Sequence, residues 1–258
     1  MIKKSITLAM IGIIAIGSLS QLKAQDEAAE SPMWESIILT PDNTKLKILG
    51  ENMRKHNQKY HSEDGPYKAN VFNIASGPNI GKLVWMMGPL KYAHLDSRPA
   101  EGGHDEDWRD NVMQYVKKIQ NGEYWKGDVA LSNTEMLTGD ASVYPILFVR
   151  YWELNLEHAH GTPRLLKLIS ETIKGMEKEF PWGVYYNEFR QGTKIGRHVA
   201  TVGFSKKWAE YDVDLNFKKT FEKVHGEAAW DPFVRDMDML LDDSWDEVWT
   251  YNKELSGK

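Results

Sequence analysis

Polar and charged side chains occur in the middle of predicted strands, where a purely structural strand would be apolar. In the second half of the chain Tyr186, Glu188 and Arg190 alternate on one strand face, and Asn73 stands at the matching place in the first half. Burying an unpaired charge against helices is costly. We therefore predict that this face points into a space between two sheets, where it could contact a ligand.

Neighbouring strands add three residues to this candidate ligand site. Trp85 and His198 lie on the strand that follows in each half, and Arg150 is a charged residue within an apolar strand. The guanidinium of Arg150 could pair with Glu188 or with an anionic group of a ligand. The alternative is a set of ion pairs that only join the two halves, because buried ion pairs with a structural role are at least as common as functional ones.

Two local clusters contain residue types that bind metals. His158 and His160 are two residues apart, which would place both rings on one side of a strand. A zinc site needs three or four ligands, so histidines exposed on a loop are the alternative. The acidic run from His104 to Asp107 is explained by a following helix, whose dipole favours negative charge. We predict no metal site, and whether His158 and His160 bind an ion stays open.

No catalytic signature accompanies these residues. The chain has no Gly-x-Ser-x-Gly elbow, no phosphate-binding glycine loop, no His-Glu-x-x-His and no cysteine. Its ten Trp and eleven Tyr could either fill hydrophobic cores and the interfaces between domains or line an aromatic ligand cleft. The sequence therefore indicates a binding site more readily than a reaction.

The first residues are typical of a targeting segment. Lys3 and Lys4 precede an apolar run over 5–20, and the small residue Ala24 follows. This pattern predicts a secretory signal peptide over 1–24 and a disordered leader over 25–32. An uncleaved N-terminal anchor is the alternative. A secreted chain without cysteine is expected in the periplasm or at the surface of a bacterium.

The charge of the chain excludes some partners. The formal net charge is −5, and removal of the lysines in 1–24 makes it more negative. Nucleic acids and anionic membranes are bound mainly through basic patches. We therefore expect neither partner, and after cleavage no remaining stretch is apolar enough to cross a membrane.

An internal repeat indicates how the candidate residues could be positioned. The segments 66–91 and 181–206 align without a gap at an offset of 115 positions. A shared backbone needs Gly and Pro at the same bends, because Gly tolerates positive φ and Pro restricts φ. The shared positions are Pro66 and Pro181, Gly77 and Gly192, Gly81 and Gly196, and Gly88 and Gly203.

Each half is predicted to contain the same order of elements. In the first half these are a strand at 34–39, a helix at 46–60, strands at 67–75 and 82–88, a helical region around Trp108 and a strand at 128–131. In the second half they are a strand at 146–156, a helix at 165–180, strands at 183–190 and 197–204, helices at 216–224 and 230–237, and a strand at 246–251. This is the βαββαβ order of a ferredoxin-like unit. We expect a first repeat over 33–131, a linker over 132–144 and a second repeat over 145–258.

With these duplicated blocks, and with strands that carry Trp34-Glu35 and Trp152-Glu153, the chain resembles the dimeric α+β barrel superfamily in a fused, single-chain form. The resemblance implies an α+β fold with two ferredoxin-like repeats packed sheet to sheet, and a monomer with an internal pseudo-twofold axis. It also implies a cavity between the sheets.

That resemblance leaves three functions open. The first is an exported protein that binds a small, partly apolar ligand between its sheets. The second is an enzyme, since the superfamily includes cofactor-free oxygenases, haem-handling enzymes and small isomerases; haem would then be a possible cofactor and His198 the first candidate for its ligand or for an acid–base group. The third is a surface module that binds proteins through its aromatic residues.

Overall fold

The computed structural model describes residues 31–98, 102–189 and 198–257. The predicted signal peptide 1–24 and most of the predicted leader 25–32 lie outside these residues, as do Arg190 and the second hairpin turn. No helix in the described ranges has the length and apolar character needed to cross a bilayer.

The first half of the fold, here called half one, has four strands. Its elements are β1 (Met33–Pro41), α2 (Leu46–Tyr60), β2 (Ala69–Ser76), β3 (Leu83–Leu90), α3 (Tyr92–Asp96), α4 (His104–Asp107), the short turns η1 (Trp108–Val112) and η2 (Met113–Tyr115), and β4 (Val116–Gly127). The predicted last strand at 128–131 is wrong, because β4 ends at Gly127.

Half two repeats this order, with longer helices between its third and fourth strands. Its elements are β5 (Ile146–Leu154), η3 (Ala159–Gly161), α5 (Thr162–Lys174), β6 (Trp182–Asn187), β7 (Val199–Ser205), η4 (Trp208–Asp212), α6 (Phe217–His225), η5 (Glu227–Ala229), α7 (Trp230–Leu240) and β8 (Leu241–Tyr251). Helix α5 begins with Pro163 in its first turn, where proline is suited because its missing N–H needs no partner.

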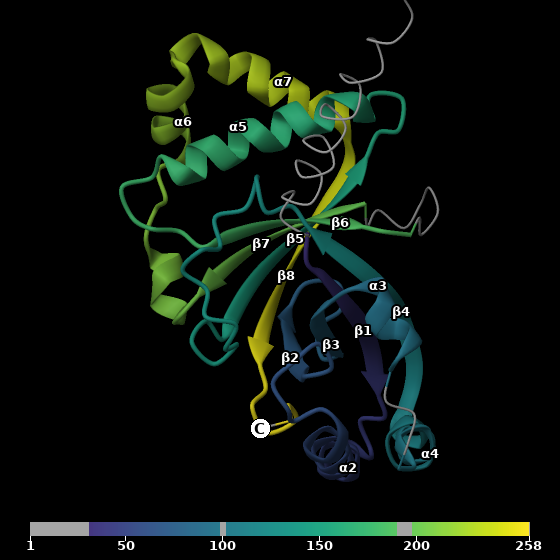
Figure 1. Ribbon diagram of the computed structural model, residues 1–258. Helices are drawn as coiled ribbons and strands as arrows, with labels where there is room; N and C mark the ends of the chain where they lie inside the picture. The colour runs from purple at the N-terminus through teal and green to yellow at the C-terminus, as the bar shows by residue number, and fades with distance from the viewer. Residues whose placement is uncertain (1–30, 99–101, 190–197, 258) are drawn as a thin grey trace, which may run out of the picture. The chain divides into compact units, whose positions relative to one another are not determined.

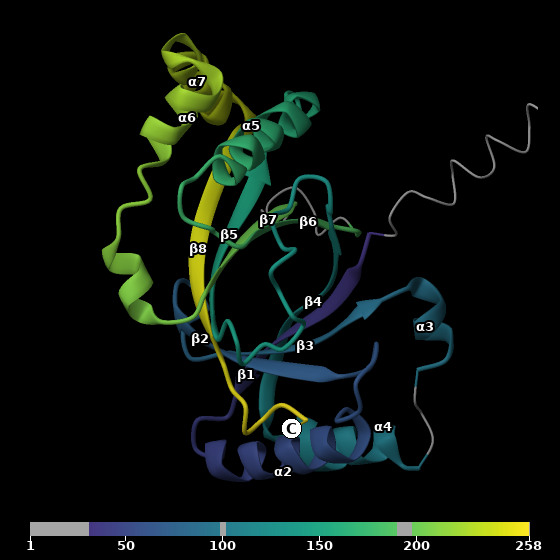
Figure 2. The same cartoon turned by 60° about the vertical axis from the view of Figure 1, so that its left-hand side comes forward.

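The eight strands form one closed barrel in the order β1-β3-β2-β8-β5-β7-β6-β4. Each half contributes the strand order of a ferredoxin-like sheet, and the halves join where β2 pairs with β8 and β4 pairs with β6. The predicted α+β fold with two βαββαβ units is confirmed. Figures 1 and 2 show α2 and α4 on the half-one side of the barrel and α5, α6 and α7 on the half-two side.

Side chains from both halves fill the interior of the barrel. The interior cluster includes Phe72 and Val84 from half one and Tyr151, Ala200 and Trp249 from half two. Two further cores lie outside the barrel, one between α2 and the sheet of half one and one beneath α5, α6 and α7. Among the described residues, these side chains pack together in the space between the sheets, where the ligand cavity was predicted.

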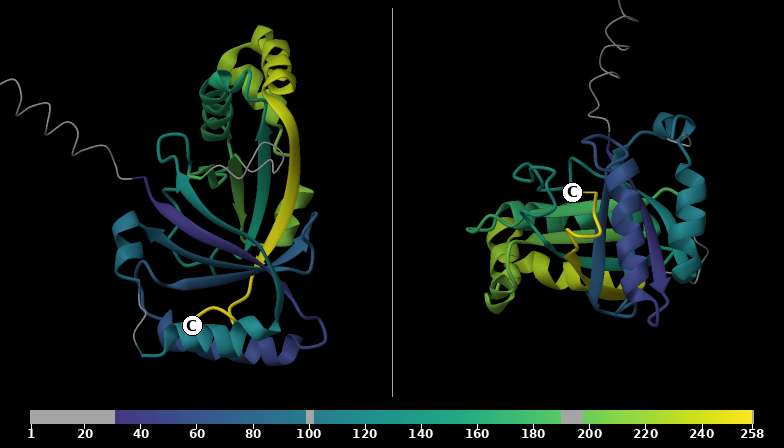
Figure 3. Two further views of the ribbon diagram at one scale, coloured as in Figure 1. Left: turned by 90° about the vertical axis from the view of Figure 1, so that its right-hand side faces the viewer. Right: turned by 90° about the horizontal axis from the view of Figure 1, so that it is seen from below.

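The C-terminal residues close the half-one core. They follow β8 and lie between α2 and the sheet, as the two views of Figure 3 show. Asn57 of α2 donates a hydrogen bond from Nδ2 to the Leu255 carbonyl, and the Val71 amide donates to Ser256 Oγ. A Cβ added to Gly257 would lie 2.5 Å from the His61 carbonyl oxygen, so this residue has to be glycine.

The structural register of the repeat differs from the gapless alignment. Asn252 and Asp128 follow β8 and β4, and their amides donate to the carbonyls of Val71 and Val184, respectively. Val71 is therefore equivalent to Val184. Since Val71 pairs with Trp85 and Val184 pairs with Thr201, Trp85 corresponds to Thr201 and not to Ala200. A one-residue shift moves a side chain to the other face of a sheet.

Candidate functional site

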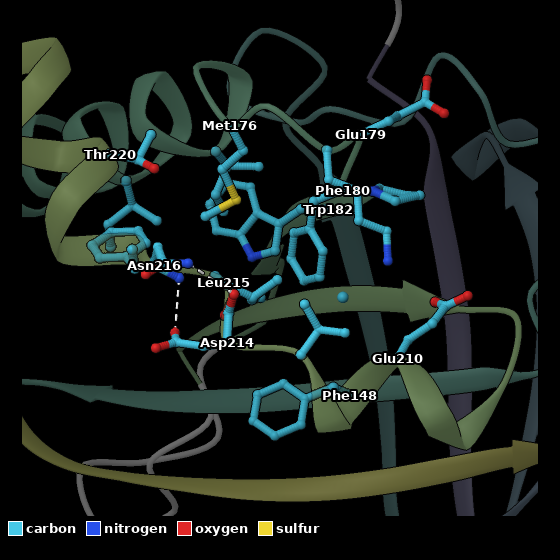
Figure 4. A pocket seen from close by; sticks show the side chains of 18 of the residues that line it. Phe148, Met176, Glu179, Phe180, Trp182, Glu210, Asp214, Leu215, Asn216 and Thr220 are labelled. Atoms are coloured by element: carbon cyan, nitrogen blue, oxygen red, sulfur yellow. Dashed lines mark hydrogen bonds between the residues drawn. The ribbon is translucent and has the colours of Figure 1, made fainter.

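A large pocket lies in half two, on the outer face of the sheet. Its volume is about 960 Å³, at the upper end of the range of small-molecule sites. Strands β5, β6 and β7 form its floor, and α5, α6, α7 and the connections around them form its walls. Figure 4 shows Met176, Phe180 and Trp182 projecting toward the same space, with Phe148 across from them.

The pocket has an aromatic floor and a charged rim. Its apolar lining includes Phe148, Trp152, Phe180, Trp182, Phe217, Trp230 and Phe233. Its charged lining includes Glu177, Glu179, Lys206, Glu210, Asp214, Lys219 and Lys223. Such a site would take an apolar body into the floor and keep a polar group near the rim.

Two small residues leave room for the pocket. In half one the outer face of β3 carries Trp85 and Met87, which pack beneath α2. The equivalent positions in β7 are Thr201 and Gly203, and both line the pocket. Glycine at 203 lets Phe180 approach closely, since a Cβ there would lie 3.1 Å from Phe180 Cζ.

Polar groups in the floor are held by neighbouring side chains. Thr201 Oγ1 accepts a hydrogen bond of 3.0 Å from the Trp152 indole N–H. The Arg150 guanidinium donates two hydrogen bonds of 2.7 and 2.8 Å to Asp246 on the neighbouring strand β8. This carboxylate raises the pKa of Arg150. The suggested pairing of Arg150 with Glu188 is therefore wrong.

The structure separates most of the residues that sequence predicted to share a site. Trp85 packs in the half-one core and Tyr186 against the half-two core, both on helix-covered faces. The expectation that this strand face points between the sheets is wrong, because alternation specifies two faces without saying which one the helices cover. Of the predicted residues that the structure describes, only Arg150 lines the pocket.

Asn73 and Glu188 lie at the two joins of the barrel. Asn73 Oδ1 accepts a hydrogen bond from Asn252 Nδ2. Glu188 follows β6 and accepts a hydrogen bond of 2.7 Å from the Tyr92 hydroxyl in half one. Burial, together with this carboxylate, raises the pKa of Tyr92 to about 12. Both hydrogen bonds link half one to half two, as the structural alternative for these residues predicts.

The histidines proposed from sequence lie outside the pocket. His198 Nδ1 accepts a hydrogen bond of 3.1 Å from the Leu154 amide. His158 and His160 lie in a turn and in η3 instead of on a strand, so the geometry assumed for a shared ion does not occur.

The described lining does not fit a histidine-ligated haem. An axial ligand to haem iron is a His, Cys, Met or Tyr side chain. The lining residues of these types are Tyr144, Met176, Tyr211 and Met237, with no His or Cys in the part of the lining that the structure describes. Burial raises the pKa of Tyr211, which works against a tyrosinate ligand. We derive no chemistry through haem.

The residues that sequence reasoning missed are those of the pocket itself. Phe180 and Trp182 look like ordinary core residues in sequence, and Thr201 and Gly203 look like strand and turn residues. The sequence signal that could have revealed the pocket was the smaller side chain of half two at two equivalent positions: Gly203 in place of Met87, and Thr201 in place of Trp85. It was hidden because the gapless alignment pairs Trp85 with Ala200.

Comparison with known proteins identifies the fold. No family model matches the chain, and no curated protein matches its sequence. A proposed monooxygenase from Fusobacterium nucleatum subsp. nucleatum superposes with a TM-score of 0.54 at 9% identity, covering 87% of this chain and 94% of that chain. A proposed chlorite dismutase gives 0.53 at 7% identity, with 87% and 96% covered. A proposed monooxygenase from Lactobacillus acidophilus NCFM gives 0.51 at 10% identity, with 86% and 94% covered.

These neighbours belong to the dimeric α+β barrel superfamily. The chain has the dimeric α+β barrel fold. The fold predicted from the repeat is thereby confirmed, with both units in one polypeptide. At these identities the likeness extends to the fold alone, so a function for this dimeric α+β barrel protein has to be argued from its own pocket.

Proposed function

We propose that this protein binds a small, partly apolar ligand in the half-two pocket. The observation that carries the proposal is the difference between equivalent places in the two halves. Half one has a packed core around Trp85 and Met87, whereas half two has a cavity of about 960 Å³ at Thr201 and Gly203. A pocket of this size with a mainly apolar lining and a few polar groups is typical of sites that bind small ligands.

The lining supports a ligand with an aromatic or aliphatic body and one polar group. Trp152, Trp182 and Phe233 are each less than 7% exposed, so they offer rigid apolar walls. The rim carries both signs of charge, and Lys206 Nζ already lies 5.0 Å from the Tyr144 ring centroid. A lysine so placed could contact an anionic group on the ligand.

A fluorescent probe tests this proposal directly. We expect one molecule of 1-anilinonaphthalene-8-sulfonate to bind per chain and to quench tryptophan emission, because its rings match the aromatic floor and its sulfonate matches a lysine on the rim. Native mass spectrometry of protein purified from its own cells would then identify a retained ligand by mass.

Variants can locate the binding. Gly203→Met restores the half-one residue at the floor and should weaken probe binding by at least about 10-fold, or 1.4 kcal/mol. Gly122→Met is a matched control, because a Cβ at Gly122 meets nothing within 4 Å and the residue is exposed outside the pocket. Equal binding by the wild type and by Gly203→Met would contradict the proposal.

An enzyme that acts on the bound ligand is the second candidate. The named neighbours include proposed monooxygenases, and the ligand found by mass spectrometry would be the substrate to test. For the haem-handling form of this candidate, haemin titration is the test. If haemin gives a Soret band, we expect the band to persist in His198→Ala, because His198 does not line the described part of the pocket.

We also propose that the protein is exported. The basic residues Lys3 and Lys4, the apolar run after them and Ala24 support a signal peptide that ends at residue 24. The mature protein from its own cells should then begin at Gln25 by intact mass. A mass that includes residues 1–24 would favour the uncleaved anchor.

A further inference from the structure

Three buried histidines meet in half one, outside the pocket: two are close in sequence and the third lies more than forty residues further along the chain. His56 lies on the inner side of α2, His61 directly after this helix, and His104 at the start of α4. Their exposed fractions are 1%, 3% and 8%. Their ring centroids lie 4.9 to 5.3 Å apart, and the candidate ligand atoms of the three all lie within 4.8 Å of one another.

Each of the three rings is held by an acceptor at Nδ1. His56 Nδ1 lies 2.8 Å from an Asp107 carboxylate oxygen, and His104 Nδ1 lies 2.7 Å from an Asp105 carboxylate oxygen. His61 Nδ1 lies 2.7 Å from the Tyr67 carbonyl oxygen. A carboxylate or carbonyl oxygen can only accept, so all three Nδ1 atoms carry hydrogen and donate. This sets the tautomer with the lone pair at Nε2 in each neutral ring.

The three Nε2 atoms are therefore left with lone pairs and no donors. His56 Nε2 is buried and has no hydrogen-bond partner in the described part of the chain. His61 Nε2 and His104 Nε2 lie 3.0 Å apart, where two lone pairs repel each other. A cation that accepts all three lone pairs would remove both conflicts.

We propose that His56, His61 and His104 bind one first-row divalent transition-metal ion, with Zn²⁺ the first expectation, through their Nε2 atoms. Imidazole nitrogen is a preferred ligand of zinc, and three histidines plus water complete a tetrahedral site. Zinc–nitrogen bonds of 2.0–2.1 Å place the ligand nitrogens about 3.3 Å apart in such a site. The separation of 3.0 Å between His61 Nε2 and His104 Nε2 is close to this value.

The surroundings match those of known metal centres. Histidine ligands of metals commonly donate their second N–H to a carboxylate or a carbonyl, and an apolar shell excludes solvent. Here both features occur, since Trp85 and Trp108 have ring centroids 5.2 Å from His61 and 5.0 Å from His56, respectively. A haem is not the expected occupant, because its axial ligand is a single ring facing the porphyrin and not three nitrogens facing one another.

The alternative is a shared proton. If the His104 ring were doubly protonated, its Nε2–H could donate to His61 Nε2 across the 3.0 Å separation. This state would satisfy one of the two conflicts and leave His56 Nε2 without a partner. It makes no use of metal, so metal binding discriminates between the two states.

The first experiment uses the full chain, treated with a chelator and dialysed, and Zn²⁺ or Co²⁺ alone. We expect one ion per chain by elemental analysis, visible absorption bands of four-coordinate Co²⁺, and a rise in Tm of about 5–10 °C at an ion concentration 100 times the Kd. Failure of Zn²⁺, Co²⁺, Ni²⁺, Cu²⁺ and Fe²⁺ to bind in a one-to-one ratio would overturn the proposal.

Variants assign the ligands. His61→Gln should abolish stoichiometric binding. Asp107→Asn, which replaces the carboxylate beside His56 Nδ1, should weaken binding by about 10- to 100-fold. The matched control is the double variant His158→Gln with His160→Gln, which should bind like the wild type. Unchanged binding by His61→Gln, or loss of binding in the control, would overturn the assignment.

A measurement on the wild type covers the case in which His61→Gln does not fold. Nitrogen-15 NMR of the histidine rings should show Nε2 shifts of three residues on addition of Zn²⁺, with the Nδ1 atoms still protonated. Rings that show one imidazolium at pH 7 and no response to Zn²⁺ would instead establish the shared proton.

Discussion

Half one and half two have the same strand order and yet use the space beneath their helices differently. In half one, α2 and the C-terminal residues pack onto the sheet around Trp85, and three histidines meet at the end of the helix. In half two the same face of the sheet opens into a pocket. Two copies of one architecture have thus diverged on their outer faces.

The difference arises from side-chain size at equivalent positions. Trp85 and Met87 fill half one, and Thr201 and Gly203 leave half two open. The joins of the barrel, by contrast, are conserved between the halves. Val71 and Val184 each donate their amide to a serine, Ser256 and Ser132, respectively. Backbone pairing therefore maintains the fold while the outer faces are free to change.

The largest effect is expected when half one receives the residue of half two. Trp85 is 5% exposed, and its indole donates to Asn57 Oδ1. Trp85→Thr should therefore lower the free energy of unfolding by about 3–5 kcal/mol. The reciprocal change Gly203→Met should alter it by less than about 1.5 kcal/mol, because the Phe180 ring has to shift only slightly and the pocket has room for the rest of the side chain. Urea unfolding measures both, and equal losses would contradict the comparison.

Two buried glutamates test how alike the joins are. Glu123 accepts from the indole of Trp125, and Glu247 accepts from the indole of Trp249, each two residues further along its strand. Each carboxylate accepts hydrogen bonds from two donors. Replacing either glutamate by Gln turns one acceptor oxygen into an N–H₂ donor, which then faces another donor.

We expect Glu123→Gln and Glu247→Gln each to lose about 1.5–3 kcal/mol of unfolding free energy. The two losses should agree within about 1 kcal/mol if the halves remain equivalent here. Chemical denaturation of both variants beside the wild type provides the measurement, and a loss confined to one variant would show that this pair has diverged as well.

A pH series probes the half-two core. Burial raises the pKa of Tyr186 to about 12, against about 10 in an unfolded chain. Between about pH 10 and 12 the tyrosine ionises in the unfolded chain but not in the folded protein, which favours unfolding. The contribution of Tyr186 to the free energy of unfolding is therefore complete below about pH 10 and is lost as the pH rises toward 12.

Tyr186→Phe should reduce this alkaline loss of stability by about 1–2 kcal/mol at pH 12. Unfolding free energies of the wild type and the variant at pH 8, 10, 11 and 12 test this, with pH 8 as the internal reference. Parallel curves for the two proteins would show that Tyr186 ionises as it does in water.

The smallest effect is expected for Arg150. Its side chain and that of Asp246 are 41% and 39% exposed, and ion pairs at that exposure contribute less than about 1 kcal/mol. Arg150→Met should therefore change the unfolding free energy by no more than this amount in low salt. A larger loss would indicate that the pair anchors β5 to β8, and would weaken the view that packing alone separates the halves.

Much of the fold was accessible from sequence because periodicity reports local structure. The apolar spacing from Leu46 to Tyr60 predicts a helix, and α2 has these bounds. The strand at 128–131 was placed too late because β4 is largely exposed over its first half, so it lacks the apolar alternation that marks a strand.

The candidate sites were not accessible in the same way. His104 lies 43 residues after His61. In the sequence, His56 lies within a predicted helix and His104 before one, and no role was assigned to His61. Arg150 was found because a charge within an apolar strand is unusual, but its partner Asp246 lies almost a hundred residues away, on a strand that only the pairing of β5 with β8 brings beside it.

The amino-acid sequence by itself determined the two ferredoxin-like units, since Gly, Pro and apolar spacing act over a few neighbouring residues. Tertiary structure alone decided which strand face the helices cover, where a cavity remains and which histidines meet. Those outcomes depend on register between strands and on side-chain volumes from distant segments, and a shift of one residue exchanges the two faces of a strand.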